Sequence, residues 1–185
     1  MALAPQLAGE LLEQALAAAL TLDDEWYRIG ALTGLAPQLT GEQRAQALTA
    51  VLAVASAFED ERHQAEALTV LAPQLTGELL DRALIVAFAP ENEEYRTAVL
   101  AALRPQLVGE LLAQALAATL ALAREGSRAW ALAALAPQLA GELLEQALVA
   151  ALAFEDEWHR ADVLAALAPQ LINELLEQAL AAACL

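Results

Sequence analysis

The chain has 185 residues, of which 59% are hydrophobic, and its formal net charge is −16. Such an acidic excess argues against binding nucleic acid, whose phosphates require lysine and arginine, and against binding an anionic membrane surface. The longest apolar stretches, such as 47–58, are too short to cross a bilayer. The single cysteine, Cys184, excludes an internal disulfide and a cysteine-based metal cluster. We therefore expect a cytoplasmic protein.

A five-residue motif recurs six times and sets the organisation of the chain. Leu-Ala-Pro-Gln-Leu, which reads Leu-Arg-Pro-Gln-Leu in one copy, ends at residues 7, 39, 75, 107, 139 and 171, so the spacings are 32, 36, 32, 32 and 32. A fixed period in this range is typical of stacked helical hairpins. The abundant Ala, Leu, Glu and Gln favour helices, and no segment shows the alternation of a strand. The sequence predicts an all-α fold, an α-solenoid of antiparallel helix hairpins with about eleven helices in a right-handed superhelix.

The motif divides the chain into repeats within one predicted domain, 1–185. The repeats cover about 9–40, 41–76, 77–108, 109–140 and 141–172, and a half-repeat follows at 173–185. Each repeat has a first helix that starts at Gly or Asn, and a second helix that the recurring Pro ends or kinks. Most second helices follow a residue suited to an N-cap, and Arg124 breaks this rule; the predicted caps are Asp24, Asp60, Asn92 and Asp156. The repeat at 41–76 is four residues longer, about one helical turn, which predicts a lengthened first helix.

The second helix has a sequence pattern of its own. An Asp cap is followed by Arg one turn later and then by Ala-x-x-Leu-x-x-Leu, as in Asp156, Arg160, Ala161, Leu164 and Leu167. This pattern resembles HEAT-type repeats, and the late Pro with Trp158 distantly resembles tetratricopeptide repeats. The whole chain is most similar to degenerate bacterial α-solenoid repeats of about 32 residues. The HEAT resemblance implies a ladder between repeats made by Asp24 with Arg28, Asp60, Asn92 with Arg96, Arg128, and Asp156 with Arg160.

The sequence offers few groups suited to catalysis. No Ser, Cys or Thr has a plausible base beside it in the repeat pattern, and no phosphate-binding loop, HExxH or EF-hand motif is present. His63 and His159 lie three repeats apart, roughly 30 Å at 8–10 Å per helix layer, so they are not expected to share a metal. We therefore expect no enzyme, no cofactor and no metal. Acidic clusters fall between the two helices of a repeat, where they act as caps on a solvated edge or form a strip for a basic partner.

Candidate partner-binding residues lie where the repeats differ. A residue that recurs in every repeat, such as the Gln of the motif, is expected to do a structural job, here a hydrogen bond to the turn backbone. Variable residues near the start of the second helices are better suited to specificity, and tryptophan is favoured at interfaces. The candidates are Trp26, Tyr27, Arg62, His63, Glu94, Tyr95, Trp130, Trp158 and His159.

These observations favour a non-enzymatic helical-repeat scaffold or protein-interaction module, part of a larger array or multidomain protein. One alternative is a binder of an apolar small molecule or peptide in an Ala/Leu-lined groove. Another is a designed or consensus array without a natural ligand. The expected partner is a protein or peptide, not nucleic acid or a membrane. Self-association is a further expectation, because neither end of the array carries a polar capping repeat. Leu180 and Leu185 belong to the apolar face expected at the C-terminal end.

Overall fold

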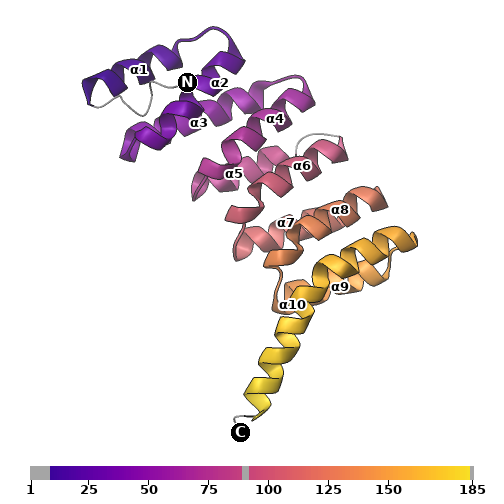
Figure 1. Ribbon diagram of the computed structural model, residues 1–185. Coiled ribbons are helices and arrows are strands. Elements are labelled where there is room, and N and C mark those ends of the chain that lie inside the picture. The colour runs from indigo at the N-terminus through magenta and orange to yellow at the C-terminus, as the bar shows by residue number, and fades with distance from the viewer. Residues whose placement is uncertain (1–8, 89–91, 184–185) are drawn as a thin grey trace. The chain divides into compact units, whose positions relative to one another are not determined.

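The computed structural model describes residues 9–88 and 92–183, and in the last helix it describes side chains as far as residue 173 (Figure 1). The described chain is all-α, with ten α-helices and short 3₁₀ turns, which confirms the predicted fold class. Contacts divide it into two compact units, 1–106 and 107–185. None of the described helices is long and apolar enough to cross a membrane.

Unit 1 contains three helical hairpins. The first helices form one layer and the second helices another, and each helix also packs on its neighbour in sequence. The first helices are α1 (Glu10–Leu20), α3 (Gly41–Ala57) and α5 (Glu78–Ala87). The second helices are α2 (Glu25–Leu35), α4 (Glu61–Leu71) and α6 (Glu93–Leu103).

Unit 2 repeats this arrangement with two hairpins. The first helices, α7 (Glu110–Leu120) and α9 (Gly141–Leu152), pack on each other, and so do the second helices, α8 (Glu125–Leu135) and α10 (Glu157–Ala183). Within both units, the packing of consecutive helices is that of a helical-repeat array.

The recurring motif supplies both the end of the second helix and part of the core. In the second repeat, Leu71, Ala72 and Leu75 are fully buried, and Pro73 lies in the 3₁₀ turn Ala72–Gln74. Proline lacks the N–H that the helix would need, so the helix ends while both leucines stay packed. Burying a leucine contributes roughly 1.5–3 kcal/mol, so the two leucines help to hold this turn in place.

Two further expectations about the helices are confirmed. Helix α3 has 17 residues where α7 has 11, so the insertion in this repeat lengthens a helix. The predicted caps accept hydrogen bonds from backbone N–H groups of their own helix, whereas Arg124 makes no side-chain cap bond; the caps are Asp24, Asp60, Asn92 and Asp156.

The last predicted hairpin turn does not form. The motif copy at 167–171 lies inside α10, a single helix of 27 residues that contains Pro169, so the expected boundary between the repeat at 141–172 and the half-repeat at 173–185 falls within one helix. Helices α1, α3, α5, α7 and α9 each begin at or after a glycine with a φ between 49° and 55°. At Gly109 the ψ is −125°, a combination that side chains rarely adopt, and even Asn tolerates positive φ mainly at a positive ψ. Asn173 stands at this position of the last repeat, and there the chain continues as a helix.

Candidate functional site

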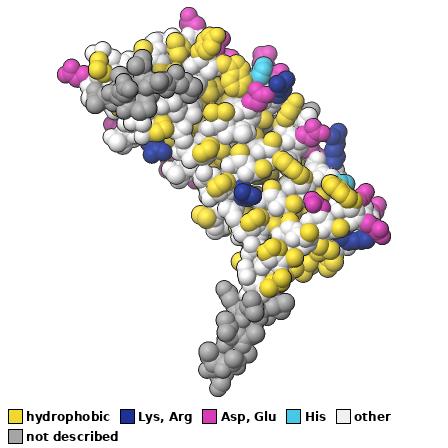
Figure 2. All heavy atoms as spheres, viewed as in Figure 1, with side chains coloured by type: hydrophobic (Ala, Val, Ile, Leu, Met, Phe, Trp, Pro, Cys, Tyr) yellow, Lys and Arg dark blue, Asp and Glu magenta, His cyan; other side chains and the backbone are white. Residues whose placement is uncertain are grey.

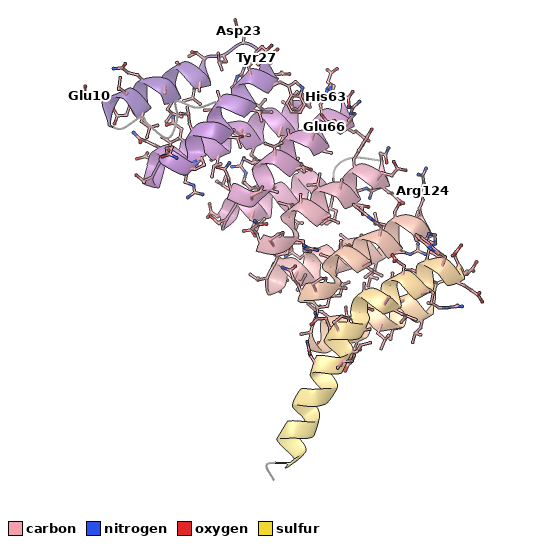
Figure 3. The ribbon with its side chains drawn as sticks, in the orientation of Figure 1. Glu10, Asp23, Tyr27, His63, Glu66 and Arg124 are labelled. Atoms are coloured by element: carbon pink, nitrogen blue, oxygen red, sulfur yellow. The ribbon has the colours of Figure 1, made fainter. Side chains whose placement is uncertain are left out.

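The candidate residues gather at one end of the hairpins. We call the two residues after the first residue of each second helix the tip positions; they are Trp26, Tyr27, Arg62, His63, Glu94, Tyr95, Gly126, Ser127, Trp158 and His159. Figure 3 shows Tyr27 and His63 at this end of unit 1, opposite Glu10. Tyr27 is 73% exposed and Trp158 is 70% exposed. Large aromatic side chains are therefore held in solvent by capped, well-packed helices.

Three rings from two neighbouring repeats meet in unit 1. The Trp26 ring lies 5.4 Å from the Phe58 ring and 5.5 Å from the His63 ring, and 5.9 Å separates the centroids of Phe58 and His63. These rings, together with Ala57 and three carboxylates, line a hollow of about 490 Å³. The carboxylates belong to Glu25, Glu59 and Asp60. The hollow thus joins aromatic faces with negative charge.

The equivalent place in unit 2 is filled by the chain itself. Phe154 is buried, and the Cζ of Arg128 lies 5.7 Å from the centroid of its ring. His159 covers Gly126 so closely that a Cβ there would lie 3.3 Å from Nε2 of His159. The Nδ1 of His159 is 3.7 Å from an Oε of Glu125. The same local sequence, Ala-Phe-Glu-Asp-Glu-x-His, therefore forms two different surroundings in the two units.

The remaining candidates have diverse surroundings. Arg62 pairs with Glu66 at 2.8 Å on the surface of α4, and Trp158 packs against His159 at 5.2 Å. Glu94 is exposed and Tyr95 is half-buried on α6. Trp130 is 52% exposed but lies one turn further along α8 than the tip positions. The structure therefore brings Trp26 together with His63, and Trp158 together with His159.

Glutamates link two of the tips to the next repeat. In unit 1, a carboxylate oxygen of Glu61 accepts the backbone N–H of Asn92 at 3.1 Å. In unit 2, Glu125 accepts the N–H groups of Asp156 at 2.9 Å and of Glu155 at 3.1 Å. The Asp156 N–H above all holds the pKa of Glu125 below its ordinary value of 4.5, so this carboxylate stays ionised near neutral pH.

The arginines of the second helices serve their own repeat. The guanidinium groups donate to carbonyls of the loop between the two helices of the repeat: Arg28 to Leu22 and Asp23, Arg128 to Leu122 and Ala123, and Arg160 to Phe154. They satisfy loop acceptors that have no place in a helical hydrogen-bond ladder. In these three repeats the arginine thus closes the turn, while the cap aspartates bond their own helices.

Two of the motif glutamines donate hydrogen bonds to backbone carbonyls of the preceding repeat. The Nε2 of Gln74 donates to the Thr33 carbonyl at 3.0 Å, and the Nε2 of Gln170 donates to the Pro137 carbonyl at 3.2 Å. The predicted hydrogen bond to turn backbone is confirmed for Gln170, because Pro137 lies in the 3₁₀ turn Ala136–Gln138, whereas the acceptor of Gln74 lies inside α2.

The contribution of the two phenylalanines was not among the predictions from the sequence. Phe58 and Phe154 follow the first helices of the two repeats that also carry His at the tip, and two other repeats have Leu there, Leu22 and Leu122. The joint presence of Phe and His was therefore the signal. The surroundings that this Phe and His form depend on the tip residue of the preceding repeat, which is Trp26 in unit 1 and Gly126 in unit 2.

Figure 2 shows charged side chains gathered near the hairpin tips of each unit, with hydrophobic side chains over the helices behind them. Within the described ranges, no group of three or more His, Cys, Asp or Glu side chains could hold a metal ion. A scan against protein-family models finds no match, and searches of curated proteins and of solved structures find none either.

Proposed function

We propose that this chain is a non-enzymatic helical-repeat scaffold that binds a protein partner through its hairpin tips, as part of a larger array or multidomain protein. One observation carries the proposal: a uniform buried frame presents different residues at equivalent exposed places. Leu32, Leu68, Leu100 and Leu132 occupy one position of the second helices and are at most 1% exposed. The tips of those helices instead carry Trp26, Arg62, Glu94 and Gly126. Repeat proteins commonly place specificity on such a variable surface.

The proposal also includes the type of repeat and the compartment. We assign the repeats to a HEAT-like type and the protein to the cytoplasm. The net charge of −16 favours a protein or peptide with a basic surface over nucleic acid or an anionic membrane.

Partner capture tests the role of the tips. The chain is immobilised beside a tip variant, Tyr27→Ser, Tyr95→Ser and Trp158→Ala, and exposed to a lysate of its source cells. A control variant, Leu11→Ser and Val70→Ser, removes exposed apolar side chains at the opposite end of the hairpins. We expect quantitative mass spectrometry to find proteins retained by the wild type and the control but lost by the tip variant. Equal capture by the tip variant would overturn the proposal.

A second candidate function rests on a depression in unit 2. It has a volume of about 500 Å³, and Leu120, Val149, Ala150 and Ala153 supply its apolar lining beside Glu142, Glu145 and Gln146. Val149 is 69% exposed, so an apolar ligand would cover a hydrophobic side chain that water now surrounds. Native mass spectrometry of the purified chain tests this candidate: a bound small molecule that Val149→Glu removes would support it, and a ligand-free mass would count against it.

A further inference from the structure

We propose that the hollow between the first two repeats binds an arginine side chain of the partner. This inference rests on the proposed function and names the chemistry of one of its contacts. The hollow is lined by the rings of Trp26, Phe58 and His63 and by carboxylates of Glu25, Glu59 and Asp60. A guanidinium group is planar, stacks on aromatic faces and pairs with carboxylates, so it uses both kinds of wall.

The three rings form one contiguous aromatic surface. Trp26, Phe58 and His63 are each partly exposed, and their centroids lie within 5.9 Å of one another. A cation interacts favourably with an aromatic ring at up to about 6 Å from its centroid, and tryptophan is the strongest partner. One guanidinium in the hollow can therefore contact more than one ring.

The charges of the hollow favour a cation from outside. Glu25, Glu59 and Asp60 are exposed at its rim, and N–H groups of His63 and Arg62 hold the pKa of Asp60 below its ordinary value of 3.8. The neighbouring arginines have other partners: Arg62 pairs with Glu66, and Arg28 donates to backbone carbonyls. Asp60 already accepts backbone N–H groups of α4 through Oδ1, so Glu25 and Glu59 supply the carboxylates with which a cationic side chain can pair.

The chain itself provides a precedent for this contact. In unit 2, the guanidinium of Arg128 lies 5.7 Å from the Phe154 ring, at the place equivalent to Phe58. There Gly126 leaves room for His159 to close over the site. In unit 1, Trp26 stands where Gly126 stands in unit 2, and Phe58 faces Trp26 and His63. The first hollow therefore repeats the aromatic and acidic chemistry in an open form.

The test uses a small arginine probe. Acetyl-Gly-Arg-Gly-amide is titrated into the ¹⁵N-labelled full chain at moderate salt, and the indole N–H signal of Trp26 is followed by NMR. The citrulline peptide, which has the same shape but no charge, is the matched ligand. We expect saturable shifts at Trp26 in the millimolar range, and binding of the citrulline peptide at least about tenfold weaker.

Variants separate the hollow from the rest of the surface. Trp26→Ala and Phe58→Leu remove ring faces, and Phe58→Leu restores the residue found at Leu22 and Leu122. Binding by these two is followed through backbone amide signals of the hollow, and both should lose at least about tenfold in affinity. Trp130→Ala removes another exposed tryptophan, outside the tip positions, and should bind like the wild type. Circular dichroism verifies that each variant is folded.

Several results would overturn this proposal. They are no saturable binding, equal binding of the citrulline peptide, or undiminished binding by both folded hollow variants. The two proposals can fail separately. If partner capture depends on the tips but the arginine probe does not bind, the hollow is excluded and the scaffold function stands. If the probe binds but capture is independent of the tips, the scaffold function fails instead.

Discussion

Glycine has opposite effects at two kinds of position in these repeats. Gly109 precedes α7 with a φ of 54°, whereas Gly30 lies inside α2, and a Cβ added at either glycine would meet no other atom within 4 Å. We expect Gly109→Ala to destabilise unit 2 by about 1–2 kcal/mol, because alanine resists positive φ. Gly30→Ala should stabilise unit 1 by about 0.5–1 kcal/mol, because it removes backbone freedom from the unfolded chain. Urea unfolding checks both signs, and a stabilising Gly109→Ala would contradict the turn geometry.

The folding stability should depend on pH through Glu125. Because its folded pKa lies below the ordinary 4.5, its contribution is present above that value and is lost as the pH falls through the lowered pKa. We expect Glu125→Gln to lower the thermal midpoint at neutral pH, and the difference from the wild type to shrink below about pH 4. A difference that stays constant across this range would show that the charge of Glu125 contributes nothing.

Single residues could be predicted from sequence where their role is local. The caps at Asp24, Asp60 and Asp156 depend on the next few residues, and their bonds are as expected. The hollow could not be predicted in this way, because Trp26 comes from one repeat while Phe58 and His63 come from the next. Its formation depends on which residue the preceding repeat offers.

At the scale of helices, we predict that residue 173 controls whether the motif copy at 167–171 makes a turn. We expect Asn173→Gly to interrupt α10 near residues 170–173, because glycine permits the positive φ that begins the other first helices. Asn173→Ala is the matched control and should remain helical. Cα chemical shifts of residues 168–173 report the outcome. A Gly variant as helical as the Ala variant would show that residue 173 does not control the turn.

A large core truncation should loosen the helices that pack around it. Leu116 is fully buried in α7, which packs on α8 and α9. Leu116→Ala should cost roughly 2–5 kcal/mol, and amide hydrogen exchange should accelerate first in these helices, because repeats contact mainly their neighbours. The exposed Val149→Ala in α9 serves as the control and should change little. Uniform acceleration in both units would contradict a repeat-by-repeat architecture.

Most helix boundaries followed from the period of the sequence. The positions of the prolines predicted the ends of α2, α4, α6 and α8. The four extra residues of the second repeat lengthen α3, as expected. The prediction failed where Asn173 replaced a glycine, since the proline motif and the glycine must act together to reverse the chain. The motif at 167–171 is therefore compatible with both a turn and a helix.

For the molecule as a whole, charge and exposed apolar surface act against each other. The net charge of −16 should keep copies apart at low salt, while side chains such as Leu11 and Ile85 expose apolar surface. We predict that salt, by screening the repulsion, increases the apparent mass in light scattering at tens of micromolar.

The predicted contribution of Leu180 and Leu185 to this association concerns side chains outside those described. Leu180→Ser with Leu185→Ser tests that contribution and should reduce the effect of salt. A strict monomer at every salt concentration, unchanged by these substitutions, would contradict self-association.

The interruption of the turn pattern at Asn173 has a consequence for how such arrays evolve. The other elements of a turn, the proline and the buried leucines, are already encoded in the copy at 167–171. If residue 173 controls the turn as predicted, a lineage that duplicates one repeat gains a new hairpin when the junction carries glycine and a longer helix when it carries asparagine. A point mutation at this junction therefore determines whether a duplicated repeat adds a hairpin to the array or extends a helix. These two products differ in fold, so they would be under different selection.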